Sequence, residues 1–144
     1  MTARRILDEK GGSVITAPPD MTLTDAARVL TEHRIGAVVI CQPGDSTPLG
    51  VFSERDLARL VAEEGPSALQ LGVSQVMSTD LVTADGLADV NALMELMTQR
   101  RVRHVLIVEA GALVGVVSIG DVVKRRIAEA EAEAAAMRSY IETA

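Results

Sequence analysis

Aromatic residues are nearly missing from this sequence. Its 144 residues include one tyrosine, one phenylalanine and no tryptophan, although 48% of the residues are hydrophobic. A core must therefore be built from valine, leucine, isoleucine, alanine and methionine. The scarcity of aromatic rings also excludes stacking as the main basis of ligand recognition.

Cysteine and long apolar runs are scarce as well. Cys41 has no partner for an intramolecular disulfide, which indicates a reducing compartment, and we interpret it as a small buried hydrophobic residue. No stretch approaches the roughly 18 apolar residues of a membrane-spanning helix. Residues 1–12 lack the apolar segment of a secretory signal. These absences predict a cytoplasmic protein without a membrane partner.

The chain has no excess of positive charge. Its formal net charge of −6 disfavours nucleic-acid binding, because that binding requires clustered lysine and arginine to neutralise phosphates. Arginines do gather locally, at Arg100, Arg101 and Arg103. A local basic patch in an acidic protein favours a small anion over a polyanion.

Motifs of familiar catalytic sites are absent too. The patterns HxxxH, CxxC, GxSxG and Gly-Lys-Ser/Thr do not occur, and the only histidines are His33 and His104. We therefore predict that the protein is not an enzyme and uses no metal or catalytic cofactor. A nucleotide hydrolase is the weakest alternative, and release of phosphate or nicotinamide on incubation would reveal it.

What the chain does contain is an internal repeat. Residues 16–40 overlay residues 83–107 without a gap, and each copy is followed by a strand ending in Gly-x-x-Ser-x-x-Asp, at 50–56 and 115–121. Identical pairs are Thr16/Thr83, Ala17/Ala84, Thr31/Thr98, Arg34/Arg101, Val38/Val105 and Ile40/Ile107. A half of about 55 residues is marginal for an independent core. The halves are therefore expected to pack together with pseudo-twofold symmetry, which creates two clefts.

Hydrophobic periodicity and turn residues predict a β-α-β-β-α unit in each copy. In the first copy the strands are expected at 14–16, 35–41 and 49–52, with one helix capped by Thr22 and another over 54–63. In the second copy the strands are expected at 81–83, 102–108 and 113–117, and the helices over 89–99 and from 121 onward. A short N-terminal helix over 3–10 should end at Gly11-Gly12. The fold class is α/β (α+β).

This organisation divides the chain into five segments. They are a helical lead (1–12), the first repeat (13–64), a connector with a helical turn at 67–71 (65–75), the second repeat (76–128) and a helical extension (129–144). The last helix carries a heptad-like apolar stripe at Val123, Ile127, Ala130, Ala134, Met137 and Ile141. It packs either on its own domain or against a second copy. Its alanine-rich seam buries little area, so we expect it to supplement an interface rather than create one.

Each Ser-x-x-Asp element lies where a strand turns into a helix, and it admits two interpretations. Serine is a preferred N-cap and an acid three residues on suits the helix dipole, so Ser53/Asp56 and Ser118/Asp121 are explained as caps. The same helix start also attracts phosphate. Serine adds a hydroxyl donor, and aspartate can accept two hydrogen bonds from a ribose diol. The motif therefore also suits a nucleotide.

The start of the middle strand differs between the copies. Gly36 leaves space where the second copy places Arg103, with His104 next to it. Arg55 adds a charge to the first Ser-x-x-Asp motif that Gly120 lacks in the second. These charges either contact an anion in the clefts or are solvated surface residues. The basic residues are unequally shared, so we expect the two clefts to differ in ligand or affinity.

The paired β-α-β-β-α units, each closed by Gly-x-x-Ser-x-x-Asp, resemble a tandem cystathionine-β-synthase (CBS) domain pair, or Bateman module. The resemblance covers residues 13–128, and "GVFSERDLAR" and "RRVRHVLIVEAGALVGVVSIGDVVK" are typical of short bacterial stand-alone CBS pairs. Such proteins are sometimes labelled as related to inosine-monophosphate dehydrogenase, but the chain has no room for that enzyme's barrel.

The resemblance implies a regulatory module that binds AMP, ADP, ATP, NAD(H) or S-adenosylmethionine between the repeats. It places adenine among aliphatic residues, ribose on aspartate and phosphate on serine and on basic residues that include His104. One cleft would hold Thr16, Ile35, Gly36, Val116, Ser118 and Asp121. The other would hold Thr83, Val102, Arg103, Val51, Ser53, Arg55 and Asp56. The family also tends to form flat homodimers and to act on a partner protein, which is unidentified here.

Two departures from the family pattern stand out. Val38-Val39 and Val105-Leu106 replace a proline that is often present in the middle strand, and Gly36 replaces a polar or basic residue. The second departure removes a phosphate contact from one cleft. The alternative to a sensor is a structural or protein-interaction adaptor with vestigial clefts.

Overall fold

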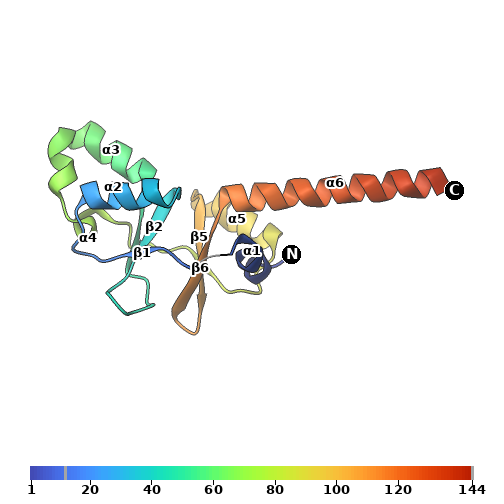
Figure 1. Ribbon diagram of the computed structural model, residues 1–144, viewed down its shortest axis with the longest axis horizontal. Helices are drawn as coiled ribbons and strands as arrows, with labels where there is room; N and C mark the ends of the chain where they lie inside the picture. The colour runs from blue at the N-terminus through green and yellow to red at the C-terminus, as the bar shows by residue number, and fades with distance from the viewer. Residues whose placement is uncertain (12, 144) are drawn as a thin grey trace.

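The computed structural model describes residues 1–11 and 13–143. These residues form two three-stranded sheets, which belong to the two repeats (Figure 1). The first repeat comprises β1 (Thr16–Ala17), α2 (Leu23–Glu32), β2 (Ala37–Ile40), β3 (Gly50–Ser53) and α3 (Glu54–Glu64). The second comprises β4 (Thr83–Ala84), α5 (Val90–Arg100), β5 (His104–Glu109), β6 (Ala112–Ser118) and α6 (Ile119–Thr143). The predicted pair of β-α-β-β-α units is confirmed.

The two sheets have the same topology and the same register. In the first sheet β1 runs parallel to β2, with Thr16 opposite Val39, and β3 runs antiparallel to β2. In the second sheet Thr83 lies opposite Leu106 in the same way, and β6 runs antiparallel to β5. Because Val39 and Leu106 occupy matching places in the repeat, the pairing follows the duplication seen in the sequence.

The helix ends follow the capping residues. Thr22 accepts a hydrogen bond from the Asp25 N–H at the start of α2, and Asp89 accepts one from the Ala92 N–H at the start of α5. Arg34 and Arg101, an identical pair in the repeat, both adopt a left-handed backbone with φ of 53° just after α2 and α5. This conformation lets each chain turn sharply into its middle strand, at a cost that a glycine would not carry.

Among the residues that the structure describes, three apolar clusters make up the core. One fills the first repeat around Phe52 and Leu23, and another fills the second repeat around Leu93 and Ile107. The third cluster joins the repeats, because Val39 and Cys41 of the first pack with Leu106 and Leu113 of the second. The halves therefore bury apolar faces against each other, as their small size predicted, and Cys41 is buried as expected.

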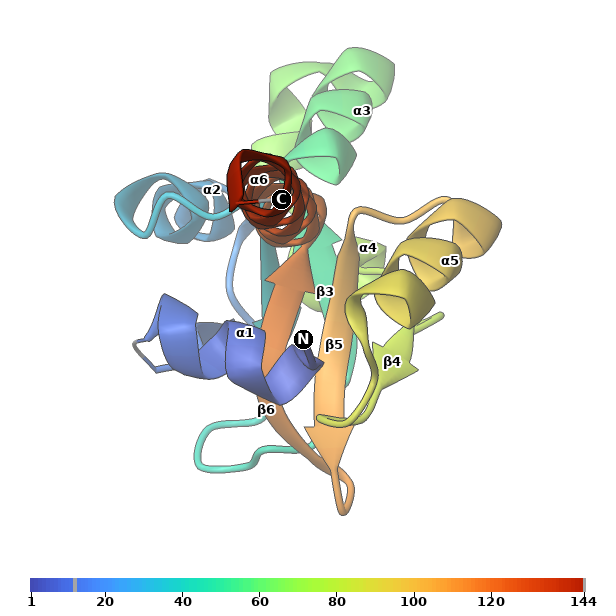
Figure 2. The ribbon, with the colours of Figure 1, turned by 90° about the vertical axis from the view of Figure 1, so that its right-hand side faces the viewer.

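Helix α1 (Ala3–Lys10) precedes the first repeat but packs on the second (Figure 2). Ala3 and Ile6 are buried in the second repeat's core, and the Ala3 N–H donates to the Ala88 carbonyl. The helix ends at Gly11, whose φ of 68° breaks the helical conformation, while Gly12 lies outside the described residues. The sequence predicted this helix but not its place against the other half of the molecule.

The connector contains a 3-10 helix, η1 (Gly65–Gln70), and a one-turn helix, α4 (Val73–Val76). The helical turn was predicted, whereas α4 was not. It packs in the first repeat through the fully buried Val73, and it starts at Gly72, whose N–H donates to the Gln75 side chain. A four-residue helix is too short to show a period in the sequence.

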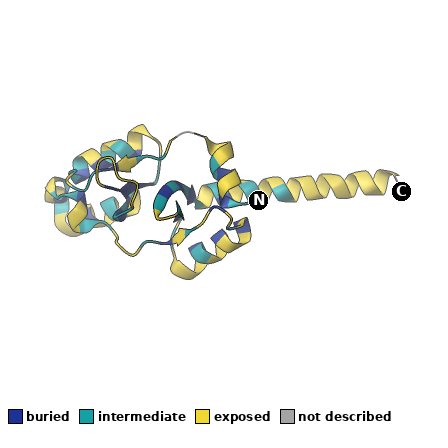
Figure 3. Ribbon diagram, turned by 90° about the horizontal axis from the view of Figure 1, so that it is seen from below, coloured by how far each residue is buried: buried dark blue, intermediate teal, exposed yellow. Residues whose placement is uncertain are grey.

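Helix α6 leaves the body of the protein after its first turns, as Figures 1 and 3 show. Its buried residue is Val122, and every residue from 131 to 143 is exposed. The interpretation that the whole helix packs on its own domain is therefore wrong. Ile127, Met137 and Ile141 of the apolar stripe are 55%, 63% and 68% exposed. Among the described residues, no helix combines the length and apolar character needed to cross a membrane.

Candidate functional site

The larger of the two predicted clefts has a volume of about 460 Å³. We call it the open cleft because none of the described lysines lines it. The first repeat contributes the end of β3 and the first turn of α3, and the second repeat contributes the start of β5. Predicted residues on its wall are Gly36, Val51, Ser53, Arg55, Asp56, Val102, Arg103 and His104. The structure thus brings together one repeat's Ser-x-x-Asp motif and the other repeat's basic segment.

The start of α3 holds Ser53 and Asp56 in a capping box. The Asp56 N–H donates to Ser53 Oγ (3.2 Å), and the Ser53 N–H donates to Asp56 Oδ2 (3.0 Å). The cap interpretation of this motif is therefore confirmed. In this capping box the Ser53 hydroxyl only accepts, so its proton can still be donated to a ligand. Asp56 Oδ1 takes no part in the box, and the Arg59 guanidinium lies 3.7 Å from it.

The first turn of α3 has fewer free N–H groups than a bare helix start. The Glu54 N–H donates to the Gly36 carbonyl, and the Asp56 N–H is used by the cap. The corresponding N–H groups of the second repeat are used in the same way: the Ile119 N–H donates to the Arg103 carbonyl, and the Asp121 N–H donates to Ser118 Oγ. An anion at either helix start therefore depends mainly on side chains, with the helix dipole adding to their attraction.

Four arginines line the open cleft against three carboxylates. Arg59 pairs with Asp56 and Glu63 on its own helix. Arg55, Arg101 and Arg103 form no salt bridge with any residue that the structure describes, and all three are exposed. Three uncompensated guanidinium groups beside a serine hydroxyl make an environment suited to phosphate.

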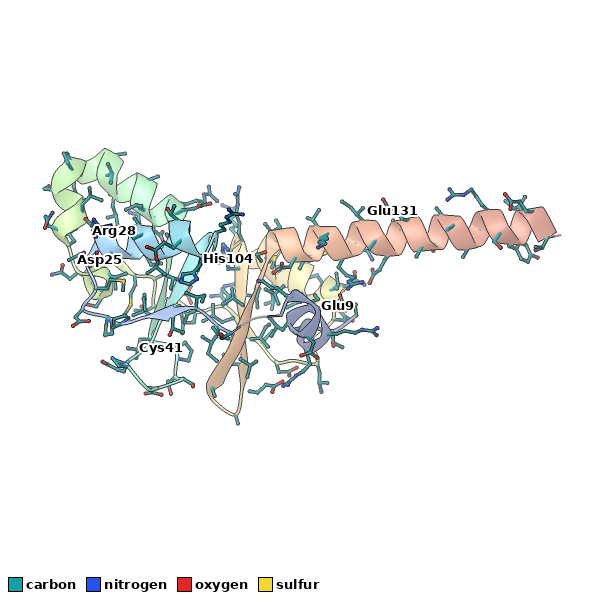
Figure 4. All side chains as sticks on the ribbon, in the orientation of Figure 1. Glu9, Asp25, Arg28, Cys41, His104 and Glu131 are labelled. Atoms are coloured by element: carbon teal, nitrogen blue, oxygen red, sulfur yellow. The ribbon has the colours of Figure 1, made fainter. Side chains whose placement is uncertain are left out.

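His104 lies where the two repeats meet, and Figure 4 shows it between them. A Cβ at Gly36 would lie 3.3 Å from His104 Nε2, so the missing side chain at position 36 makes room for this ring. Burial has the largest effect on the pKa of His104 and lowers it, and Lys10 lowers it further. Asp121 and Glu54 act in the opposite direction, and Arg103 adds the smallest lowering effect. His104 therefore faces the open cleft as a neutral imidazole near neutral pH.

The other predicted cleft is smaller, about 230 Å³, and we call it the closed cleft because the side chain of Lys10 lines it. Ile35 and Val116 line it as predicted, but residues of α1 and the segment that follows it line it as well, including Leu7 and Lys10. Lys10 Nζ donates to the Val116 carbonyl (3.0 Å) and to Asp121 Oδ2 (2.9 Å). Lys10 thus forms an ion pair with Asp121, the carboxylate that the CBS resemblance assigns to the ribose.

Asp121 is held in its ionised form. Burial alone would raise its pKa, but hydrogen bonds from the Ser118 N–H and from Lys10 outweigh that effect and lower it below the usual value. Ser118 and Asp121 form the same capping hydrogen bonds as the first repeat, at 3.2 and 2.9 Å. The carboxylate and the ammonium of Lys10 therefore stay paired well into the acidic range.

Five predicted site residues are placed differently from the expectation. Gly36 lines the open cleft rather than the closed one, because it packs against His104 of the other repeat. Thr16 and Thr83 are exposed and line neither cleft, whereas the residues just before them, Ile15 and Val82, do. Successive strand residues face opposite sides, so an error of one position reverses the side chain. Ser118 and Asp121 also line neither cleft, and Asp121 lines a separate pocket together with Lys10.

The sequence reasoning missed several residues of these walls. Arg59, Arg101, Ser78 and Asp80 line the open cleft. Arg101 was identified only as part of a basic cluster, although its identity with Arg34 was a signal. Lys10 was missed because it precedes the repeats and its contacts are more than 100 residues away in sequence. In residues 1–11 and 13–143, no cluster of side chains could hold a metal ion.

Comparisons with known proteins agree with the geometry. The family model of the CBS domain matches residues 6–63 and 73–128. The chain is 32% identical to the CBS domain-containing protein CBSX3, mitochondrial, of Arabidopsis thaliana over 98% of this chain and 72% of that protein. It is similar to the crystal structure of the CBS-domain containing protein ATU1752 from Agrobacterium tumefaciens (TM-score 0.83, 44% identity, 88% and 99% covered).

A further similar structure was solved with a ligand. It is the CBS domain protein PAE2072 from Pyrobaculum aerophilum complexed with AMP, with a TM-score of 0.75, 28% identity and coverage of 84% and 89%. The family matches span most of the chain and cover the two β-α-β-β-α units, and the first match also includes part of α1. The chain therefore belongs to the CBS-domain family, and its repeats form a CBS-pair regulatory module.

Proposed function

We propose that this protein is a non-enzymatic sensor that binds an adenosine-containing ligand in its open cleft. The observation that supports this most is the union of Ser53, Asp56 and unpaired arginines around one cleft of about 460 Å³. That volume falls within the range of small-molecule sites. The AMP complex of a similar protein supports an adenine nucleotide as the ligand class.

The open cleft offers a separate environment to each part of a nucleotide. Adenine would lie among the aliphatic side chains of Val51, Val102 and Leu106, all of which line the wall. The ribose diol would donate to Asp56 Oδ1, which lies 3.7 Å from the Arg59 guanidinium and is not used by the cap. The phosphate would receive hydrogen bonds from the Ser53 hydroxyl and from Arg103 and Arg55. Because the arginines surround the phosphate end, ligands with more phosphate charge should bind more tightly.

Calorimetric titration with AMP, ADP, ATP, NADH and S-adenosylmethionine tests the sensor function. We expect saturable binding of at least one of them. Asp56→Asn keeps an acceptor for the Ser53 N–H but removes the charge, and it should weaken that binding while leaving thermal unfolding nearly unchanged. If none of the five binds, the protein is better explained as an adaptor with vestigial clefts.

The remaining assignments are part of the same proposal. The protein would be cytoplasmic and would pass its ligand state to a partner protein. It would act as a homodimer of two CBS pairs, and the five segments named from the sequence would be its functional units. The stripe on α6 supports a second copy as a neighbour, because basic Lys124 and Arg126 and acidic Glu131 and Glu133 flank it. When two such helices pair, either antiparallel or parallel, charges of opposite sign face each other.

Replacing apolar residues of the α6 stripe with serine should weaken the dimer without abolishing it. Burying one large aliphatic side chain is worth about 1.5–3 kcal/mol, so Met137→Ser with Ile141→Ser should raise the dimer dissociation constant about tenfold or more. Sedimentation over a concentration series measures that constant. The matched control is Ala135→Ser with Ala136→Ser, on the other side of the helix. Equal constants for both variants would remove α6 from the interface.

A further inference from the structure

The side chain of Lys10 lines the closed cleft and reaches Asp121, which lies next to the cleft in a separate pocket that Lys10 also lines. Its ammonium group contacts Asp121 Oδ2 at 2.9 Å and the Val116 carbonyl at 3.0 Å. Both partners belong to the set that the CBS resemblance assigns to a ligand. The Lys10 side chain therefore binds both the carboxylate expected to accept from the ribose and a backbone carbonyl of β6.

Lys10 is delivered to the cleft by a firmly attached helix. The helix α1 is anchored by buried Ala3 and Ile6 and by ion pairs of Arg4 with Glu109 and of Glu9 with Arg125. Its Leu7 covers the strand that forms the cleft wall, since a Cβ at Gly115 would lie 2.6 Å from the Leu7 side chain. The position of Lys10 therefore follows from core packing and not from a chance surface contact.

The equivalent place in the open cleft is arranged differently. Val51 matches Val116 in the repeat, and its N–H and carbonyl pair with the backbone of Ser78. Asp56 matches Asp121, and its nearest cation is Arg59 at 3.7 Å. No lysine enters the open cleft from the described residues, so its aspartate keeps an oxygen available.

We propose that Lys10 is the residue that limits the protein to one nucleotide per chain, because it occupies the closed cleft in place of the ribose. This inference rests on the proposed nucleotide binding by the open cleft. A ligand entering the closed cleft must exchange a charge-assisted contact to Asp121 for a neutral hydroxyl, which is the weaker partner. It must also find room beside Leu7 in a volume half that of the open cleft.

Removing the ammonium group should make the second cleft available. Titration calorimetry with AMP, ADP and ATP, used separately, should give one site per chain for the unaltered protein. With the tightest of the three, Lys10→Ala and Lys10→Met should give two sites, with affinity for the closed cleft at least tenfold higher than before. Lys10→Met keeps the aliphatic stem over the cleft and protects the test against loss of folding. Arg5→Ala, on the exposed side of the same helix, is the control and should keep one site.

A second substitution assigns the new site. Adding Asp121→Ala to Lys10→Ala should return the count to one, and adding Asp56→Ala should leave the site of the closed cleft. Two sites in the unaltered protein, or one site in both lysine variants, would overturn the role of Lys10 while nucleotide binding stands. If nucleotide binds only after the loss of Lys10, the blocking role of Lys10 would be supported and nucleotide binding by the open cleft would be refuted. No binding by any of these proteins would refute both proposals.

Discussion

Phe52→Ala is expected to lower the free energy of unfolding by about 3–5 kcal/mol, the range found when a buried phenylalanine is truncated. Phe52 is the only phenylalanine in the chain and is fully buried on β3, at the centre of the first repeat's core. Its neighbours are aliphatic side chains of α2, β2 and α3. These cannot collapse far enough to fill the lost volume, because they belong to helices and strands fixed by their own hydrogen bonds. Urea unfolding followed by circular dichroism measures the change.

Two other substitutions make the result specific. Phe52→Leu retains most of the volume and should cost less than about 1.5 kcal/mol. Tyr140→Ala removes the other aromatic residue, which is 71% exposed on α6, and should change stability by less than about 0.5 kcal/mol. A loss below 1 kcal/mol for Phe52→Ala would contradict the view that the first repeat is built around this ring.

Arg103→Ala is expected to weaken nucleotide binding by about tenfold to a hundredfold. A hydrogen bond to a charged group is worth about 1.5–3 kcal/mol, and each 1.4 kcal/mol is a factor of about ten. Arg103 lines the open cleft and has no salt-bridge partner among the described residues, so its loss should not damage the fold. Calorimetry with the tightest nucleotide measures the effect.

The phosphate assignment has an internal control. Adenosine lacks the phosphate, so Arg103→Ala should leave adenosine affinity unchanged while nucleotide affinity falls. Arg28→Ala removes an arginine on α2 that lies outside the open cleft and pairs with Asp25. That variant should bind both ligands normally. An equal loss for adenosine and nucleotide would show that Arg103 shapes the cleft rather than contacting phosphate.

Sequence reasoning succeeded where the signal was local or duplicated. The two Ser-x-x-Asp caps, the Thr22 cap and the paired strands all follow from residues within a few positions of each other, and the repeat supplied each one twice. The repeat predicted two clefts, and the CBS resemblance implied that each joins one repeat's motif to the other's middle strand. The CBS resemblance rested on these same elements.

The role of Lys10 and the position of Gly36, which make the two clefts different, could not be predicted from local patterns or from the repeat. Lys10 lies outside the repeat, and its partners are fixed only when α1 packs on the second half. Gly36 was read as a lost phosphate contact, whereas the structure shows that it accommodates the His104 ring from the opposite repeat. Both facts depend on contacts between segments far apart in sequence, which no local pattern contains.

The projecting helix α6 has a mechanical consequence. It begins directly after Ser118, the last residue of β6, and extends for 25 residues, which makes it about 37 Å long at 1.5 Å per residue. A tilt of about 10° at its base would displace its far end by about 6 Å, since a rigid rod turns angle into distance in proportion to its length. A small rotation at the base of α6 would thus become a displacement of several ångströms at its far end, where another molecule could bind.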